Sequence, residues 1–206
     1  MQDIAISSTA LIVCSPLLAL VALAILYDDG RPILFRQKRI GRNGRTFDVL
    51  KFRKFRAVGS VQGSMLTLLS DDRYSRVGRI LERTKLNELP QLVNVLRGDM
   101  SIVGPRPEIV EFAHCFSGQR AALLDHRPGI FGPSQSAFRN EAAMYPADVD
   151  AVTFYETRLF PAKADLDLAY YPVATTGSDL AWIVRSLVAV IRPARAAAES
   201  LITPFA

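Results

Sequence analysis

The chain has 206 residues, half of them hydrophobic and 22% charged, and this balance excludes a disordered protein. The length suits one ordinary domain whose core needs no disulfide or metal for stability. Cys14 and Cys115 cannot form a disulfide framework and have no metal-ligand spacing around them, so we expect free thiols. Two histidines are too few for a histidine-rich metal site.

Residues 4–26 form an uncharged run that is long enough to cross a bilayer core as a helix. Asp3 is the only charged residue before it, so the run lacks the basic segment of a secretory signal. Ser15 and Pro16 interrupt its middle, and proline bends a helix by removing a backbone hydrogen bond. From the residues alone, a kinked span and a helix that returns to the same face are equally compatible with this run.

Positive charge is concentrated directly after this run. Ten basic residues and one acid lie between Arg31 and Arg56, so this segment carries +9, whereas the net charge of the chain is +5. The segment indicates an anionic partner, which is a phosphate-rich ligand, a membrane surface or nucleic acid. Its position after the apolar run places the rest of the chain on the cytoplasmic side.

Local patterns predict the remaining elements. Two strands at 32–35 and 46–52, joined by a turn at 41–44, form a basic hairpin, and a surface loop follows at 57–72. Helices are predicted at 73–83, 91–97 and 108–125, and a late amphipathic helix at 179–191. A rigid loop at 103–107 fixes Arg106, and a second loop rich in proline and glycine lies at 127–133. The last helix carries Trp182, which suits an interfacial or a core position.

Four strings of the sequence resemble the bacterial sugar transferases, which are monotopic polyprenyl-phosphate phosphoglycosyl transferases. They are FRQKRIG (35–41), GRTFDVLKFR (44–53), TKLNELPQLVNVLRGDMSIVGPRP (84–107) and RPGIFG (127–132). The third string is highly specific. The resemblance implies a small membrane-associated α/β domain with a re-entrant helix over 1–27, a basic β-hairpin and amphipathic interfacial helices. It also implies that residues 28–206 form a transferase domain on the cytoplasmic face of the bacterial inner membrane.

The resemblance implies a reaction as well. Sugar-1-phosphate passes from a nucleotide diphosphate sugar to polyprenyl phosphate, with Mg²⁺, to start glycoconjugate or exopolysaccharide assembly. An aspartate of an Asp-Glu pair attacks the β-phosphorus, UMP leaves, and the lipid phosphate attacks the phosphoryl-enzyme. Two phosphate-bearing substrates require cationic groups, and anionic membrane lipid is a further expected partner. Whether the chain forms a homo-oligomer stays open.

Site residues follow from position in these strings. Lys51 matches the active-site lysine of the family, and Glu88 matches the second acid of the pair, which is the expected Mg²⁺ ligand. The expected phosphate or nucleotide ligands are Arg53, Arg83, Arg106 and Arg139. The plainer alternative is that Lys51, Arg53 and Arg139 are solvated surface charges.

The chain departs from the family pattern at the nucleophile, where Asn87 replaces the aspartate. A carboxamide has no anionic oxygen and is a far poorer nucleophile. Glu82 stands where an arginine is common, and 133–135 replace an aromatic-rich loop. Three explanations are open. The chain is an active transferase that uses another carboxylate, such as Glu88, or direct attack by the lipid phosphate. Alternatively, it is a silent homologue that binds these ligands or acts as a scaffold, or Asn87 is a substitution made for study.

Two further expectations concern partners and chain ends. The basic segment has phenylalanines among its cations, but they alternate as hairpin core residues do, and an apolar run adjoins them. We therefore expect no nucleic-acid partner. Family members frequently carry additional N-terminal segments, so this chain is either naturally short or part of a longer one.

Overall fold

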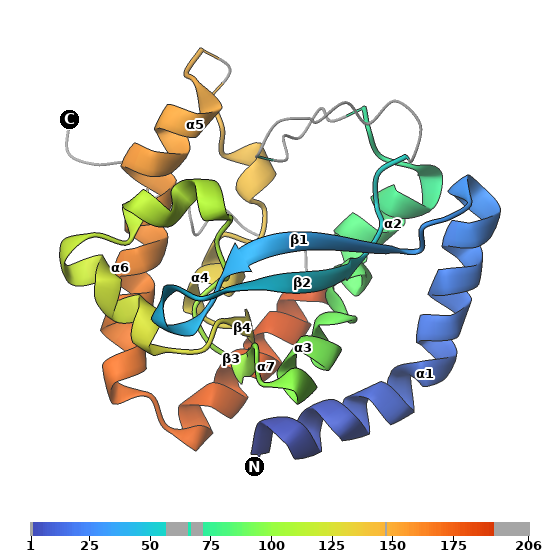
Figure 1. Ribbon diagram of the computed structural model, residues 1–206, viewed down its shortest axis with the longest axis horizontal. Helices are drawn as coiled ribbons and strands as arrows, with labels where there is room; N and C mark the ends of the chain where they lie inside the picture. The colour runs from blue at the N-terminus through green and yellow to red at the C-terminus, as the bar shows by residue number, and fades with distance from the viewer. Residues whose placement is uncertain (1, 57–65, 67–71, 147, 192–206) are drawn as a thin grey trace.

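A computed structural model describes residues 2–56, 66, 72–146 and 148–191 (Figure 1). The protein mixes helices with short strands, as expected. Its α-helices are α1 (Gln2–Asp29), α2 (Arg76–Thr84), α3 (Gln91–Arg97), α4 (Pro133–Ala137), α5 (Ala151–Phe154), α6 (Phe160–Tyr170) and α7 (Thr176–Ile191). Its strands are β1 (Leu34–Ile40), β2 (Thr46–Phe52), β3 (Ser101–Val103) and β4 (Gly129–Phe131). Short 3₁₀ turns are η1 (Arg42–Gly44), η2 (Leu86–Glu88), η3 (Val110–Cys115), η4 (Gly118–Asp125), η5 (Glu141–Ala143) and η7 (Tyr171–Val173), and η6 (Tyr155–Leu159) is a π-helix.

Helix α1 is long and bends around one side of the body (Figure 1). It contains Pro16, and the hydroxyl of Ser15 donates to the carbonyl of Ile12 at 2.8 Å. With a mean hydropathy of 2.6 in its most apolar stretch, the helix is long and apolar enough to cross a membrane. Ile12 and Val13 are 73% and 71% exposed, so much of this apolar surface is not covered by the rest of the protein.

Both ends of α1 are bonded to the folded body. Near its start, the carboxylate of Asp3 accepts hydrogen bonds from the hydroxyl of Ser101 at 2.9 Å and the amide of Ile102 at 3.2 Å, both in β3. Near its end, the carboxylate of Asp28 accepts from the amide of Val77 in α2 at 2.9 Å. The two ends of the helix therefore contact the same unit.

Strands β1 and β2 pair antiparallel, with Phe35 opposite Lys51 and Arg39 opposite Phe47. Because side chains alternate along a strand, Arg39 and Lys51 point to the same face of the pair. The first strand was predicted at 32–35 but runs over 34–40. The strand pairing continues up to the turn, where the amide of Gly41 donates to the carbonyl of Arg45 at 2.7 Å.

The second sheet pairs β3 and β4 parallel. Strand β4 lies inside the loop predicted at 127–133, and β3 overlaps the loop predicted at 103–107 only at Val103. Gly104 and Gly129 allow this pairing, because a Cβ on Gly129 would lie 2.0 Å from the amide nitrogen of Gly104. The predicted helix over 108–125 is also wrong. That stretch forms η3 and η4, which are separated near Gly118, whose φ of +58° does not continue a helix.

Other predicted helices are present. The segment predicted at 91–97 is α3, followed by Gly98 at φ +80°, and those predicted at 73–83 and 179–191 fall on α2 and α7. The loop predicted at 57–72 lies outside the described residues except at Leu66 and Asp72. The largest buried cluster joins η3, η6 and α6, and a second joins β2, α3 and β3. The second cluster adjoins the pocket described below, because Val49 belongs to both.

Candidate active site

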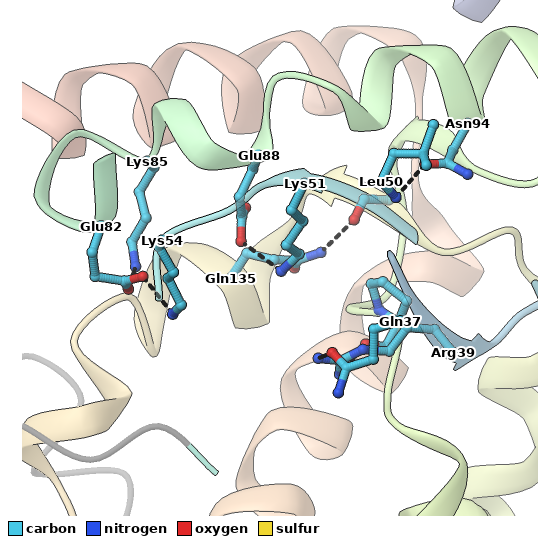
Figure 2. Close-up of polar contacts among 12 residues, drawn as sticks. Gln37, Arg39, Leu50, Lys51, Lys54, Glu82, Lys85, Glu88, Asn94 and Gln135 are labelled. Carbon is cyan, nitrogen blue, oxygen red and sulfur yellow. Dashed lines mark hydrogen bonds and ion pairs between the residues drawn. The ribbon is translucent and has the colours of Figure 1, made fainter. Parts of the chain in front are cut away.

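Lys51 on β2 and Glu88 on η2 point toward each other and form an ion pair, with 3.2 Å between Nζ and Oε1 (Figure 2). Burial lowers the pKa of Lys51 to about 8, against the opposing effect of Glu88. Burial alone acts to raise the pKa of Glu88, but Lys51 and Arg106 together with Lys85 hold it well below its usual value. At neutral pH Glu88 is therefore a carboxylate and most Lys51 side chains carry their charge.

Asn94 in α3 fixes β2 beside this helix. Its carboxamide oxygen accepts from the amide of Leu50 at 3.0 Å, and its nitrogen donates to the carbonyl of Asp48 at 2.8 Å. The side chain is fully buried and bonds the edge of β2 as another strand would. Because α3 follows η2 directly, this contact sets the position of Lys51 relative to Glu88.

A small pocket opens beside this ion pair. Its polar lining consists of Arg39, Lys51, Glu88, Gln91 and Arg106. Burial acts to lower the pKa of Arg106, but Glu88, Glu141 and Glu108 raise it above its usual value, so the guanidinium stays charged. Within the described parts of the chain, no hydrogen bond or ion pair occupies that guanidinium. It is free to bind an anionic ligand.

Arg39 was not among the predicted site residues. Its Nη1 donates to the carbonyl of Pro107 at 3.1 Å and its Nη2 to the side-chain oxygen of Gln37 at 2.7 Å. The bond to Pro107 joins β1 to the loop that carries Arg106, and the bond to Gln37 stays within β1. The signal for Arg39 was the alternation of the paired strands, which places it on the same face as Lys51.

Glu82, the acid that departs from the family pattern, lies between two lysines near this pair (Figure 2). Its oxygens are 2.7 Å from Nζ of Lys54 and 2.6 Å from Nζ of Lys85. Burial acts to raise its pKa, but the two lysines lower it to about 2. Glu82 therefore stays ionised and offsets part of the positive charge of the basic segment.

Hydrogen bonds from α4 fix the loop that carries Arg106. The side-chain nitrogen of Gln135 donates to the carbonyls of Gly104 at 2.9 Å and Gly129 at 3.2 Å. The hydroxyl of Ser134 donates to the buried carboxylate of Asp167 at 2.8 Å, and burial raises the pKa of this carboxylate to about 7. Sequence reasoning noted 133–135 only as a departure from the family.

Three predicted phosphate ligands do not line the pocket. Arg53 is 7% exposed, and its Nη2 donates to the carbonyls of Asp29 and Gly30, each at 2.8 Å, at the end of α1. Nη2 of Arg139 donates to the backbone carbonyl of Arg83 at 3.2 Å, and the Arg83 side chain is exposed. These contacts give Arg53 a structural position and hold Arg139 against the end of α2.

Asn87 is 3% exposed and does not line the pocket. Its carboxamide oxygen has no hydrogen-bond partner among the described residues. Mg²⁺ is bound in proteins through one or two carboxylates together with substrate phosphates and water. The Glu88 carboxylate lines the pocket and is a ligand of this kind, so it fits such an ion, whereas the buried carboxamide of Asn87 supplies no carboxylate to the pocket.

Comparison with known proteins gives the family. The sequence matches the family described as bacterial sugar transferase over residues 1–193. A UDP-glucose:undecaprenyl-phosphate glucose-1-phosphate transferase of Caulobacter vibrioides is 44% identical over 124 residues, which are 59% of this chain and 46% of that protein. The exopolysaccharide production protein ExoY of Sinorhizobium fredii is 36% identical over 156 residues, covering 68% and 69% of the two chains. The exopolysaccharide production protein PSS of Rhizobium leguminosarum bv. phaseoli is 49% identical over 147 residues, covering 65% and 70%. The match thus spans less than half of the Caulobacter protein but about two thirds of the other two. This chain belongs to the bacterial sugar transferase family.

Proposed function

We propose that this protein transfers a sugar-1-phosphate from a nucleotide diphosphate sugar to polyprenyl phosphate. The observation that carries the proposal is the pocket, where the Glu88 carboxylate lies among the cations Lys51, Arg39 and Arg106. Guanidinium groups bind phosphate oxygens through paired hydrogen bonds, and Arg106 has no such partner among the described residues. The names of the Caulobacter and rhizobial relatives support the same reaction and exopolysaccharide assembly as its setting.

Glu88 is the group best placed for the covalent route. Asn87 is uncharged and buried, whereas Glu88 is ionised and lines the pocket. Its oxygen bonds to the β-phosphorus while the bond from that phosphorus to the bridging oxygen breaks, and the nucleoside monophosphate leaves. An oxygen of the lipid phosphate then bonds to the same phosphorus and releases the carboxylate.

In the direct route the lipid phosphate attacks the β-phosphorus itself, and Glu88 has a supporting role. In both routes Arg106 and Lys51 hold the donor phosphates and stabilise the charge that develops on them. In the direct route, a Mg²⁺ ion held by Glu88 would supply further neutralisation of the diphosphate.

A second function is favoured by Asn87 itself. With no anionic oxygen at the nucleophile position, the protein would bind nucleotide sugar and polyprenyl phosphate without transferring the sugar phosphate. The same cations support this binding, so affinity for the donor alone does not separate the two functions.

Release of UMP from a panel of UDP-sugars, measured with Mg²⁺ in lipid nanodiscs, distinguishes these possibilities. Release of one equivalent without polyprenyl phosphate indicates the covalent route, and release only with polyprenyl phosphate indicates the direct route. Glu88→Gln removes release in the first case, and Asp165→Asn, at an exposed acid of α6, is the matched control. Donor binding with no release from any sugar would reject transfer in favour of the binding function.

We also propose that residues 1–27 enter the membrane and return to the cytoplasmic face, where residues 28–206 lie. The bonds of Asp3 to β3 and of Asp28 to α2 support this, because a spanning helix would separate its two ends by the bilayer. Cysteines placed at Gln2 and Tyr27, in a background lacking native cysteines, should both react with an impermeant maleimide in inverted vesicles and neither in spheroplasts. Labelling of position 2 in spheroplasts would show a spanning helix.

Helix α7 supports a second membrane contact. Leu180, Val184 and Leu187 are each more than half exposed and recur at helical spacing, while Ile183 packs against the second core cluster. Together with the exposed cations of the basic segment, this face suits anionic lipid. Retention on vesicles of anionic phospholipid that falls with added salt, and no comparable retention on single-stranded DNA, would support it.

A further inference from the structure

A second group of ligand-type side chains lies outside the pocket. His114 and Cys115 end η3, and Glu156 lies on the π-helix η6, far along the chain. Nε2 of His114 is 3.0 Å from Oε1 of Glu156 and 3.6 Å from Sγ of Cys115. One donor atom from each residue lies within 4.8 Å of the other two.

The hydrogen bonding of His114 determines what these atoms offer. Its Nδ1 is 3.1 Å from the backbone carbonyl of Glu111, which can only accept, so Nδ1 carries the hydrogen. In the neutral imidazole, Nε2 then presents a lone pair toward the carboxylate and the sulfur. Nε2 and the carboxylate oxygen are both electron-pair donors, so either a proton on Nε2 or a metal cation lies between them. The thiol of Cys115 can donate its hydrogen to Nε2 or, once deprotonated, join them as a third metal ligand.

The spacing and chemistry suit zinc. Tetrahedral zinc, with bonds of about 2.0 to 2.3 Å to nitrogen, oxygen and sulfur, places its ligand atoms about 3.4 to 3.6 Å apart. Two of the three separations, 3.0 and 3.6 Å, lie close to that spacing, and the third is within 4.8 Å. The bond from Nδ1 to a carbonyl is the contact that usually orients a zinc-bound histidine.

Local backbone structure also singles out this place. Glu156 sits in the π-helical turn η6, a geometry that is rare and is frequently found at functional sites. Next to it, Tyr155 stacks on Phe112 of η3 with ring centroids 4.4 Å apart, so the two segments are already held together. Ligands from both segments thus meet across a packed contact.

We propose that His114, Cys115 and Glu156 bind one Zn²⁺ ion, with water as the fourth ligand. The thiol of Cys115 passes its proton to water as the sulfur–zinc bond forms. None of the three residues lines the pocket beside Glu88, so the proposal does not depend on sugar-phosphate transfer.

The chain supplies matched controls, because it has only two cysteines and two histidines. The full chain, purified without a polyhistidine tag, is titrated with Co²⁺ as a coloured substitute that Zn²⁺ should displace. We expect one equivalent with a thiolate-to-cobalt absorption band in the wild type and in the controls Cys14→Ser and His126→Ala. Cys115→Ser should lose the band.

Two further variants avoid the buried thiol. His114→Ala and Glu156→Gln change side chains at the surface, so both should fold, and each should weaken binding at least about tenfold. A wild type without the band, or a band that survives Cys115→Ser, would overturn the proposal. Equal affinity in His114→Ala, Glu156→Gln and the controls would also overturn it, leaving His114 and Glu156 as an ordinary ion pair.

Discussion

Replacing Arg53 by alanine separates a structural role from a phosphate-binding role. The guanidinium donates to the carbonyls of Asp29 and Gly30 at 2.8 Å and lies 3.1 Å from the Asp29 carboxylate. Hydrogen bonds to a charged group contribute about 1.5 to 3 kcal/mol each, and loss of one partner of a buried ion pair costs about 3 to 5 kcal/mol. The Asp29 side chain is 21% exposed, and water offsets part of that loss. We expect about 3 kcal/mol of destabilisation.

For a chain of this size, that loss lowers Tm by about 6 to 12 °C, measured by near-UV circular dichroism in detergent. Arg36→Ala, at an exposed arginine of β1, is the control and should shift Tm by no more than about 2 °C. Well below Tm, Arg53→Ala should bind a UDP-sugar within about twofold of wild type. An unchanged Tm with a large loss of donor affinity would refute the structural role and restore Arg53 as a phosphate ligand.

Three further predictions concern the pocket. Lys51 loses its charge as pH rises through its pKa of about 8, so donor affinity measured by calorimetry should fall over that range. Lys51→Met should remove this pH dependence, and an affinity that rises with pH in the wild type would contradict the prediction. If the chain only binds its ligands because Asn87 has no anionic oxygen, Asn87→Asp restores the carboxylate and should increase UMP release in the nanodisc assay; rapid wild-type turnover that this change leaves unaltered would reject position 87 as the nucleophile and favour the routes that use Glu88. Gly104→Ala should abolish donor binding and lower Tm, because the new Cβ would lie 2.1 Å from the carbonyl oxygen of Arg127. The control Gly177→Ala should do neither, because the nearest atom to its Cβ is 3.9 Å away. Tolerance of Gly104→Ala would show that β3 and β4 can separate.

Elements with strong local signals could be predicted from the sequence. The alternation of 46–52 gave β2 with its observed bounds, and proline before and glycine after 91–97 gave α3. For the site, family resemblance together with these elements placed Lys51, Glu88 and Arg106, which the structure brings to one pocket.

What the sequence did not reveal depends on contacts between distant segments. Strands β3 and β4 have three residues each, too few to show alternation, and they pair because Gly104 and Gly129 touch. Lys51 lies on β2 and Arg53 directly follows the end of this strand, yet only Lys51 lines the pocket, because the end of α1 reaches Arg53. No local pattern in the sequence distinguishes an arginine that donates to the carbonyls at a helix end from a cation that lines a binding pocket.

The attachment of α1 at both ends has a consequence for how the protein can be divided. Asp3 bonds two residues of β3, and β3 leads directly into the loop that carries Arg106. Farther along α1, Val21 and Ile25 are buried in the same cluster as Phe52 of β2. Removing the first 27 residues would therefore take away part of the support for the pocket along with the exposed apolar surface of α1. That apolar surface and the support of the pocket belong to one helix and cannot be separated by cutting the chain.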